Sequence, residues 1–264
     1  MPDAPAVVRA SLRHRAWRYR LRVDRDEIRW MRSWLRPGDA VIDIGAYKGG
    51  YTYWMRSSVG STGSVLAFEP QPRLASYLRR CASAFSWSNV RVEEVALSSG
   101  PGRRELRVPS SEPSPAASLV GASLPADSGG YLVPVDTLDR RVAGVAAMGP
   151  VRLVKCDVEG HEMDVFEGAR GMLTADRPPL LFECEARHDP TRTVEDVFEF
   201  LHGLGYRGFF FWHGRKLGVE RFRTREHQVQ GRRPYCNNFI FVPEEGRDVR
   251  EPTAPDSASA PAGR

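Results

Sequence analysis

VIDIGAYKGGYT, residues 41–52, is the stretch that decides the fold of this 264-residue chain. An apolar run leads to an acidic residue, Asp43, and two glycines, Gly45 and Gly49, then lead into a segment of helical character. In open α/β sheets, ligands bind beyond the carboxyl ends of strands, where glycines let the backbone approach a bound nucleoside. The stretch therefore predicts a strand, a ligand-binding loop and a helix, in that order.

Outside this stretch, short apolar runs alternate with segments of helical spacing. We expect strands at residues 40–44, 64–68, 90–95, 151–158, 179–185, 208–212 and 238–242, and helices at about 49–57, 72–84, 162–174 and 193–203. Several runs are apolar at consecutive positions, as expected of strands covered on both faces. Strands that alternate with helices of this length predict a doubly wound α/β sheet.

The length and a hydrophobic content of 41% favour one folded domain, which we place at residues 37–243. Residues 109–130 are rich in Pro, Ser and Gly, so we expect a mobile surface insertion, serving either as a lid or as a simple connection. Residues 244–264 are polar and rich in Pro and Ala, and we expect them to be disordered.

Residues 1–36 form an Arg-rich leader. Ten arginines face four acidic residues there, a local charge of +6, whereas the whole chain carries +5. Helical spacing predicts one or two amphipathic helices, with an apolar face made of Leu12, Ala16, Tyr19, Val23, Ile28, Met31 and Leu35. Two interpretations stay open: a solvated helix face, or a surface for an anionic partner such as nucleic acid, a lipid surface or a phosphorylated substrate.

Other sequence features bear on the cellular environment. No apolar stretch approaches the roughly 18 residues of a membrane helix, and the leader has no hydrophobic signal core, so we expect a cytoplasmic protein without a transmembrane segment. The four cysteines form no C-x-x-C pair. We therefore expect buried thiols rather than a disulfide framework or a zinc site.

The loop after the first strand favours an adenosyl ligand without phosphates. In a dinucleotide fingerprint the second glycine admits the pyrophosphate, but Tyr47 stands at that place, and Asp43 would repel phosphates. The next strand ends in FEP, residues 68–70, where Glu69 can accept both ribose hydroxyls. Together these residues favour S-adenosylmethionine.

The segment VKCDVEGHE, residues 154–162, brings ionisable groups to the end of another strand. Lys155, Asp157 and Glu159 would share one face if the strand ran that far. Methyl transfer to a hydroxyl requires removal of a poorly acidic proton, for which Asp157, or His161 with Glu159, are candidate bases. Alternatively, Glu159 and Glu162 only cap the following helix.

Two more carboxylates, Glu183 and Glu185, end the following strand and either reach the same cleft or lie on the surface. A divalent ion held by Asp157 and Glu159 would need further ligands, so we predict no metal site.

Several motifs, taken in order, resemble those of FkbM-type S-adenosylmethionine-dependent methyltransferases. They are VIDIGAYKGGYT at 41–52, FEP at 68–70, VALS at 95–98, VDTLD at 135–139, VKCDVEGHEMDVFEGA at 154–169 and NFIFVP at 238–243. The resemblance implies a class I methyltransferase fold, a Rossmann-like sheet of seven strands whose last strand is antiparallel. It also implies methylation of a hydroxyl on a sugar, polyketide or other metabolite.

Transferred by position, the resemblance implies a set of cofactor-binding residues: Asp43, Gly45, Ala46, Tyr47, Gly49, Thr52, Glu69, Ala96 and Asp157. Tyr47 stands where the family often has Asn. The catalytic candidates stay Asp157, Glu159 and His161. We therefore expect an O-methyltransferase of natural product biosynthesis that acts on a small hydroxylated acceptor. One alternative is a nucleic-acid methyltransferase that uses the Arg-rich leader, although the sequence has no recognisable RNA-binding motif. The other alternative is a noncatalytic scaffold.

Overall fold

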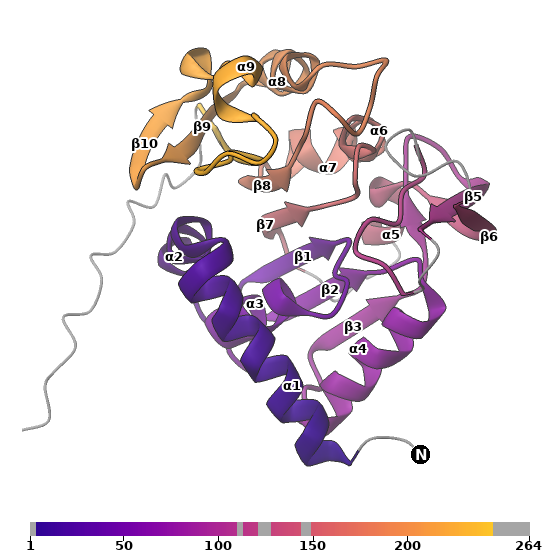
Figure 1. Cartoon of the computed structure of the whole chain (residues 1–264). Helices are drawn as coiled ribbons and strands as arrows, with labels where there is room; N and C mark the ends of the chain where they lie inside the picture. The colour runs from indigo at the N-terminus through magenta and orange to yellow at the C-terminus, as the bar shows by residue number, and fades with distance from the viewer. Residues whose placement is uncertain (1–3, 110–112, 121–127, 144–148, 245–264) are drawn as a thin grey trace, which may run out of the picture.

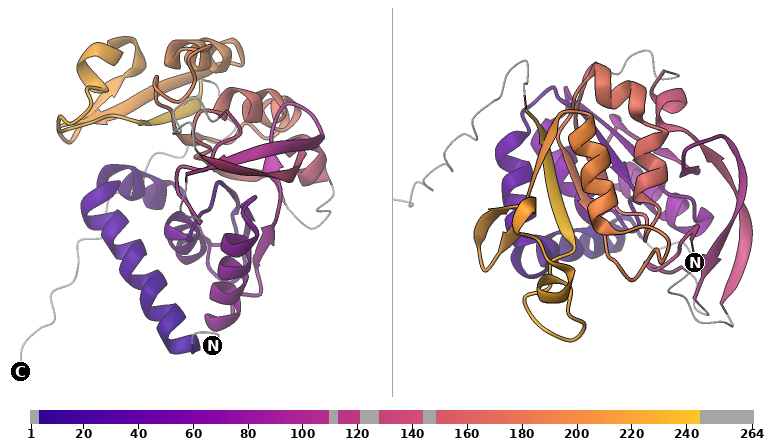
Figure 2. Two further views of the ribbon diagram at one scale, coloured as in Figure 1. Left: turned by 45° about the vertical axis from the view of Figure 1, so that its right-hand side comes forward. Right: turned by 90° about the horizontal axis from the view of Figure 1, so that it is seen from above.

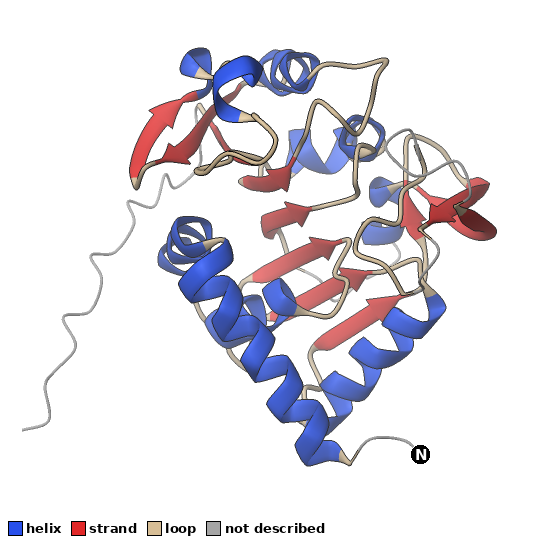
Figure 3. Ribbon diagram, in the orientation of Figure 1, coloured by secondary structure: helices blue, strands red, loops and turns tan. Residues whose placement is uncertain are grey.

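The computed structural model describes residues 4–109, 113–120, 128–143 and 149–244. Its main sheet lies between helices on both faces (Figure 1), and Figure 3 separates its strands from its helices by colour. The strands of this sheet are β1 (Ala40–Ile44), β2 (Ser64–Phe68), β3 (Val90–Glu93), β7 (Val151–Cys156), β8 (Leu180–Glu183), β9 (Tyr206–Trp212), β10 (Arg215–Gly218) and β11 (Asn238–Pro243). All seven predicted strands are present.

The strand order is β10-β9-β11-β8-β7-β1-β2-β3. Strands β1, β2, β3, β7 and β8 are parallel, and β11 runs antiparallel to both β8 and β9. This arrangement confirms the doubly wound sheet with an antiparallel last strand. The predicted count of seven strands was too low for the described residues, because β10 forms an additional hairpin with β9.

A second, smaller sheet contains β4 (Ala96–Leu97), β5 (Gly102–Val108) and β6 (Gly129–Asp136) in the order β4-β6-β5. The predicted insertion at 109–130 overlaps it, since β6 begins at Gly129 and Ser118 exchanges backbone hydrogen bonds with Arg107 at 2.9 and 3.0 Å. Ser114 and Ser118 are buried, which contradicts a wholly surface-exposed loop. Residues 110–112 and 121–127 of the insertion lie outside the described residues.

The helices that cover the main sheet follow the prediction with one correction. Helices α3 (Gly50–Val59), α4 (Pro72–Ala84) and α8 (Val194–Gly203) agree with it. The predicted helix at 162–174 is two helices, α6 (Glu162–Glu167) and α7 (Arg170–Ala175). The chain turns between them at Gly168, where a Cβ atom would lie 2.1 Å from the Ser98 carbonyl oxygen. The short helices α5 (Leu138–Ala143), η2 (Val219–Arg221) and α9 (Thr224–His227) complete the set.

The leader forms α1 (Pro5–Arg18), the π-helical turn η1 (Tyr19–Val23) and α2 (Arg25–Trp34). These elements pack along α3 and α4 (Figure 2). The backbone N–H of Asp24 donates to the Tyr19 carbonyl at 3.0 Å, and this wider turn shifts the phase of the helix. Val23, predicted on the buried face, is therefore 52% exposed, whereas Val8 is buried instead.

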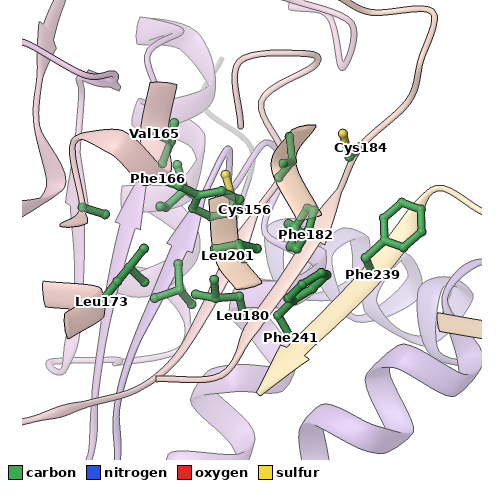
Figure 4. Packing of buried hydrophobic residues seen from close by; sticks show 14 of the residues in the cluster. Cys156, Val165, Phe166, Leu173, Leu180, Phe182, Cys184, Leu201, Phe239 and Phe241 are labelled. Atoms are coloured by element: carbon green, nitrogen blue, oxygen red, sulfur yellow. The ribbon is translucent and has the colours of Figure 1, made fainter. Parts of the chain in front are cut away.

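Two large apolar clusters fill the space on either side of the main sheet. One lies against α6, α7 and α8 and centres on Phe182, whose ring contacts those of Phe166, Phe239 and Phe241 at centroid distances of 5.2–5.9 Å (Figure 4). The other lies against α2 and α3. All four cysteines are free and buried, as expected. In the described part of the chain, no helix has the length and apolarity needed to cross a membrane.

Replacing Phe182, which is fully buried, with alanine should lower the free energy of unfolding by about 3–5 kcal/mol, because it leaves a cavity among three aromatic rings. Leu132 on β6 is 60% exposed, so Leu132→Ala is the matched control and should change the value by less than about 0.5 kcal/mol. Chemical denaturation measures both. Equal effects of the two substitutions would contradict this packing.

Candidate functional site

A pocket opens at the carboxyl ends of β1, β2 and β7, where the sequence places its candidate site. Its wall includes seven of the predicted residues: Gly45, Tyr47, Glu69, Ala96, Asp157, Glu159 and His161. Apolar side chains supply much of the remaining wall: Ile44, Phe68, Val95, Leu97, Leu106 and Leu119. This combination suits a flat, largely apolar ring system that also carries a few polar groups.

The loop between β1 and α3 depends on a close approach of two backbones. The Asp157 N–H donates to the Ile44 carbonyl at 3.0 Å, which holds the tip of β7 against that of β1. Gly45 has φ +74°, and a Cβ atom there would lie 1.8 Å from the Asp157 carbonyl oxygen. Only glycine fits at this position, so the predicted glycine requirement has a physical cause in the structure.

Glu69, directly after β2, is held in place by the backbone. Its two carboxylate oxygens accept the N–H groups of Tyr47 and Gln71, each at 2.9 Å. A carboxylate has about four acceptor positions, so Glu69 retains acceptor capacity for a ligand even with the Gln71 side chain as a further donor. Burial raises the pKa of Glu69 to about 7, although these backbone N–H groups oppose the shift. The side chain thus faces the pocket with acceptor capacity to spare.

Four of the predicted cofactor residues do not line the pocket. Asp43 is buried, and its carboxylate accepts the Thr52 hydroxyl at 2.5 Å. Ala46 packs against Ala67 and Leu78, and Gly49 (φ +78°) forms the N-terminal cap of α3. In this structure these residues support the loop from behind.

The tip of β7 differs from the prediction. The strand ends at Cys156, so Asp157 and Glu159 lie in the following loop rather than on one strand face with Lys155. The Lys155 ammonium is buried and lies 3.4 Å from the Asp157 carboxylate. Burial alone would lower the pKa of Lys155, but the carboxylates of Asp157, Glu183 and Asp24 raise it above its ordinary value. Lys155 is therefore a permanent cation at the site.

Glu159 pairs with a histidine that was not predicted as a site residue. The backbone of Glu159 is left-handed (φ +56°), and the Glu159 carboxylate lies 3.2 Å from Nε2 of the buried His188. Burial, followed by the negative charge of Asp157, raises the pKa of Glu159 to about 8. Burial lowers the pKa of His188. Glu159 does not cap α6; Glu162 instead accepts the N–H groups of Val158 and Gly160, both at 3.2 Å.

His161 lines the pocket, but other groups contact both of its ring nitrogens. Nε2 lies 2.9 Å from the Ser98 hydroxyl, and Nδ1 lies 3.6 Å from the Asp164 carboxylate. Burial lowers the pKa of His161, which favours the neutral ring. His161 and Glu159 have separate partners in this structure, so the expected pairing of these two residues is replaced by Glu159 with His188.

A third carboxylate joins the acidic loop. Asp157, Glu159 and Glu183 each place an oxygen within 4.8 Å of the others, a spacing that could surround a cation. The Lys155 ammonium already provides positive charge beside this cluster. Glu185 points elsewhere and contacts Arg187 and Tyr235. The expectation that no metal binds at this site stays a prediction.

Two segments distant in sequence complete the surroundings of the site. Asp24 of the leader accepts the Tyr51 hydroxyl at 3.0 Å and an amide N–H of Asn238 at 3.3 Å. Gln71 exchanges hydrogen bonds with the backbone of Ser114 at 2.8 and 3.1 Å, which fixes part of the 109–130 insertion to the pocket. No local motif announces these contacts, because the partners are 27 to 214 residues apart.

Comparison with known proteins shows the family and the fold of the chain. Residues 43–207 match the model of a family described as Methyltransferase FkbM domain. The chain is similar to the solved structure of methyltransferase FkbM from Methylobacillus flagellatus KT, with 15% identity and a TM-score of 0.50. That similarity covers 92% of this chain and 56% of the other, so the chain spans little more than half of that protein. The class I methyltransferase fold is thereby confirmed.

Other solved structures are similar at lower scores. They include a putative rRNA-methylase from Clostridium thermocellum, with 11% identity, a TM-score of 0.48 and coverage of 83% of this chain and 95% of that one. A SAM-dependent O-methyltransferase from Thermotoga maritima shows 13% identity, a TM-score of 0.44 and coverage of 85% and 66%. No curated protein sequence matches the chain.

Gly45→Ala should lower the free energy of unfolding by about 3 kcal/mol, because it adds both a left-handed backbone penalty and a clash with the Asp157 carbonyl. Gly100→Ala is the matched control, since a Cβ atom at residue 100 would have no neighbour within 4 Å and the backbone there is not left-handed. Chemical denaturation of both variants measures the difference. An unchanged Gly45→Ala protein would rule out this close approach.

Proposed function

Because the chain belongs to the FkbM methyltransferase family, whose cofactor is S-adenosylmethionine, we propose that it methylates a hydroxyl oxygen of a small metabolite, such as a sugar or a polyketide-type natural product. The observation that carries this proposal is that Glu69 and the acidic residues Asp157 and Glu159 line the same pocket. A role in natural product biosynthesis in the cytoplasm is part of the proposal.

The residues present fit the cofactor. Glu69 retains acceptor capacity for the ribose hydroxyls, and the apolar wall around Phe68, Ala96 and Leu97 suits an adenine ring. The nearby carboxylates favour a cationic ligand, and no phosphate-binding loop is present in the described residues. When bound, S-adenosylmethionine supplies an electrophilic methyl group on a positively charged sulfur.

We assign proton removal to Glu159 with His188. A general base works best when its pKa lies near the working pH, and the pKa of Glu159 is about 8. His188, 3.2 Å away, orients the carboxylate and shares the proton that it takes up. Asp157 is a weaker candidate because its carboxylate already forms an ion pair with the Lys155 ammonium, 3.4 Å away. Asp157 would instead orient the acceptor hydroxyl for in-line attack.

Glu69→Gln should weaken S-adenosylmethionine binding at pH 8 by about tenfold or more, because the ionised carboxylate is the better hydrogen-bond acceptor. Ribose hydroxyls donate to the ionised form, so wild-type affinity should fall as pH falls through the Glu69 pKa of about 7. Titration calorimetry at pH 6 and pH 8 measures both effects. Glu94→Gln, at a half-exposed residue outside the pocket wall, is the control, and identical affinities of all three proteins at pH 8 would disprove the role of Glu69.

Glu159→Gln should reduce kcat by about 10²–10⁴-fold while leaving cofactor affinity close to that of the wild type. The wild-type rate should rise with pH through about 8, as Glu159 ionises, and the variant should lose this rise. The assay measures formation of S-adenosylhomocysteine with a panel of monosaccharides and macrolactones. The alcohol that reacts fastest serves as the acceptor for the kcat and pH measurements.

Glu167→Gln, at an exposed position on α6, is the matched control and should keep full activity. A chelator should leave the wild-type rate unchanged, in line with the predicted absence of a metal. If the pH profile of Glu159→Gln is unaltered, a group other than Glu159 is the general base. Turnover on RNA but on no small alcohol would favour the nucleic-acid alternative, and cofactor binding without any turnover would favour the scaffold.

A further inference from the structure

Helix α1 has apolar residues on two opposite faces. Val8, Leu12 and Ala16 are buried against the body of the protein. Val7, Trp17 and Leu21, which continue on the other side into η1, are 57%, 45% and 61% exposed. A helix that packs along one face needs only one apolar stripe, and its outer face is ordinarily polar. The Trp17 ring contacts that of Trp54 at a centroid distance of 5.3 Å, but the second stripe as a whole stays largely exposed in the described part of the chain.

The outer stripe follows helical steps of three and four residues. Its members are Val7, Ala10, His14, Trp17 and Leu21, all of them exposed. Five large hydrophobic residues of the described chain are exposed, and four of them lie in the leader: Val7, Trp17, Leu21 and Val23. Leu132 on β6 is the fifth. The exposed large hydrophobic residues are thus concentrated on α1 and η1. Figure 2 shows the α1 backbone along the outer edge of the molecule.

Arginines flank the outer stripe. Arg13, Arg18 and Arg22 are exposed, and none of them pairs with a carboxylate of the described residues. Arg13 and Arg18 lie instead over the rings of Phe85 and Tyr19, at 5.4 and 5.9 Å from the ring centroids. Uncompensated positive charge beside exposed Trp and Leu is the composition of helices that lie in the interface of an anionic membrane.

We propose that the outer stripe and its flanking arginines bind the surface of a lipid bilayer that contains anionic headgroups. The helix would lie in the plane of the membrane, with Leu21 and Val7 entering the acyl boundary and Trp17 at the headgroup level. The arginines would contact lipid phosphates. This inference goes beyond the methyl transfer reaction and does not depend on it.

Charge and apolarity together favour a bilayer over other occupants. In a dimer formed through this face, the flanking arginines of one copy would lie against those of the other, and the two sets of positive charges would repel each other. Nucleic acid would use the arginines but would leave the exposed aliphatic side chains of Val7 and Leu21 without a role. Residues 245–264 contain four acidic residues and three arginines, so that segment offers little complementary charge.

Co-sedimentation of the full chain with vesicles tests the proposal. The protein should bind vesicles of phosphatidylglycerol and phosphatidylcholine in equal parts, and should not bind phosphatidylcholine alone. Arg18→Gln with Arg22→Gln should lower partitioning about 25-fold, from about fivefold for each arginine. Leu21→Gln should lower it about tenfold. Trp17→Phe should keep most of the binding but lose the blue shift of tryptophan emission that vesicles cause.

Two sets of controls lie away from the leader. Leu132→Gln removes an equally exposed apolar side chain, and Arg103→Gln with Arg225→Gln removes two exposed arginines, so neither should change partitioning. Circular dichroism and thermal unfolding verify that each variant is folded. Equal effects of the leader and control variants, or equal binding to both kinds of vesicle, would overturn the proposal. Binding to single-stranded RNA without vesicle binding, or a dimer dissociated by Leu21→Gln, would assign the stripe to those partners instead.

Discussion

The contact on which the site depends is the approach of the β1 and β7 tips. The Asp157 N–H donates to the Ile44 carbonyl, and Gly45 passes so close to the Asp157 carbonyl that no Cβ atom fits between them. This contact sets the distance between the loop that follows β1 and the loop that carries the acidic residues Asp157 and Glu159. A side chain at residue 45 would push the two loops apart, and with them the side chains that line the pocket. Catalysis by positioning requires tolerances well below such a displacement.

A buried cation connects this contact to the leader. Lys155 on β7 pairs with Asp43 on β1 in the strand register, and its ammonium lies near the Asp157 carboxylate. The same ammonium lies over the ring of Tyr51, 5.0 Å from the ring centroid. Tyr51 in turn donates to Asp24 of the leader. Burying an ammonium is unfavourable unless carboxylates surround it, so removal of any of these acids would leave charge unpaired in the interior. The leader is therefore part of the electrostatic support of the site and not an appendage.

Local sequence patterns were sufficient to predict the strands of the main sheet. Consecutive apolar residues in runs such as SVLAF and NFIFV can be buried on both faces only in a covered sheet, so the strands were predictable. The small sheet was not, because β5 has only Leu106 and Val108 buried and has the composition of a charged loop. His188 and Asp24 were missed as site residues for a different reason. Their contacts depend on tertiary packing of segments that carry no motif.

The overall charge conceals two opposite local fields. The carboxylates of Asp157, Glu159 and Glu183 gather beside the pocket, where their negative charge favours a cation. Arginines instead occupy the outside of the leader, where they attract anions. Because the Debye length is about 8 Å at physiological ionic strength, the exposed arginines are screened from the buried acids and the two fields act independently. A net charge of +5 therefore describes neither surface, and a partner or ligand has to be inferred from the charge beside it.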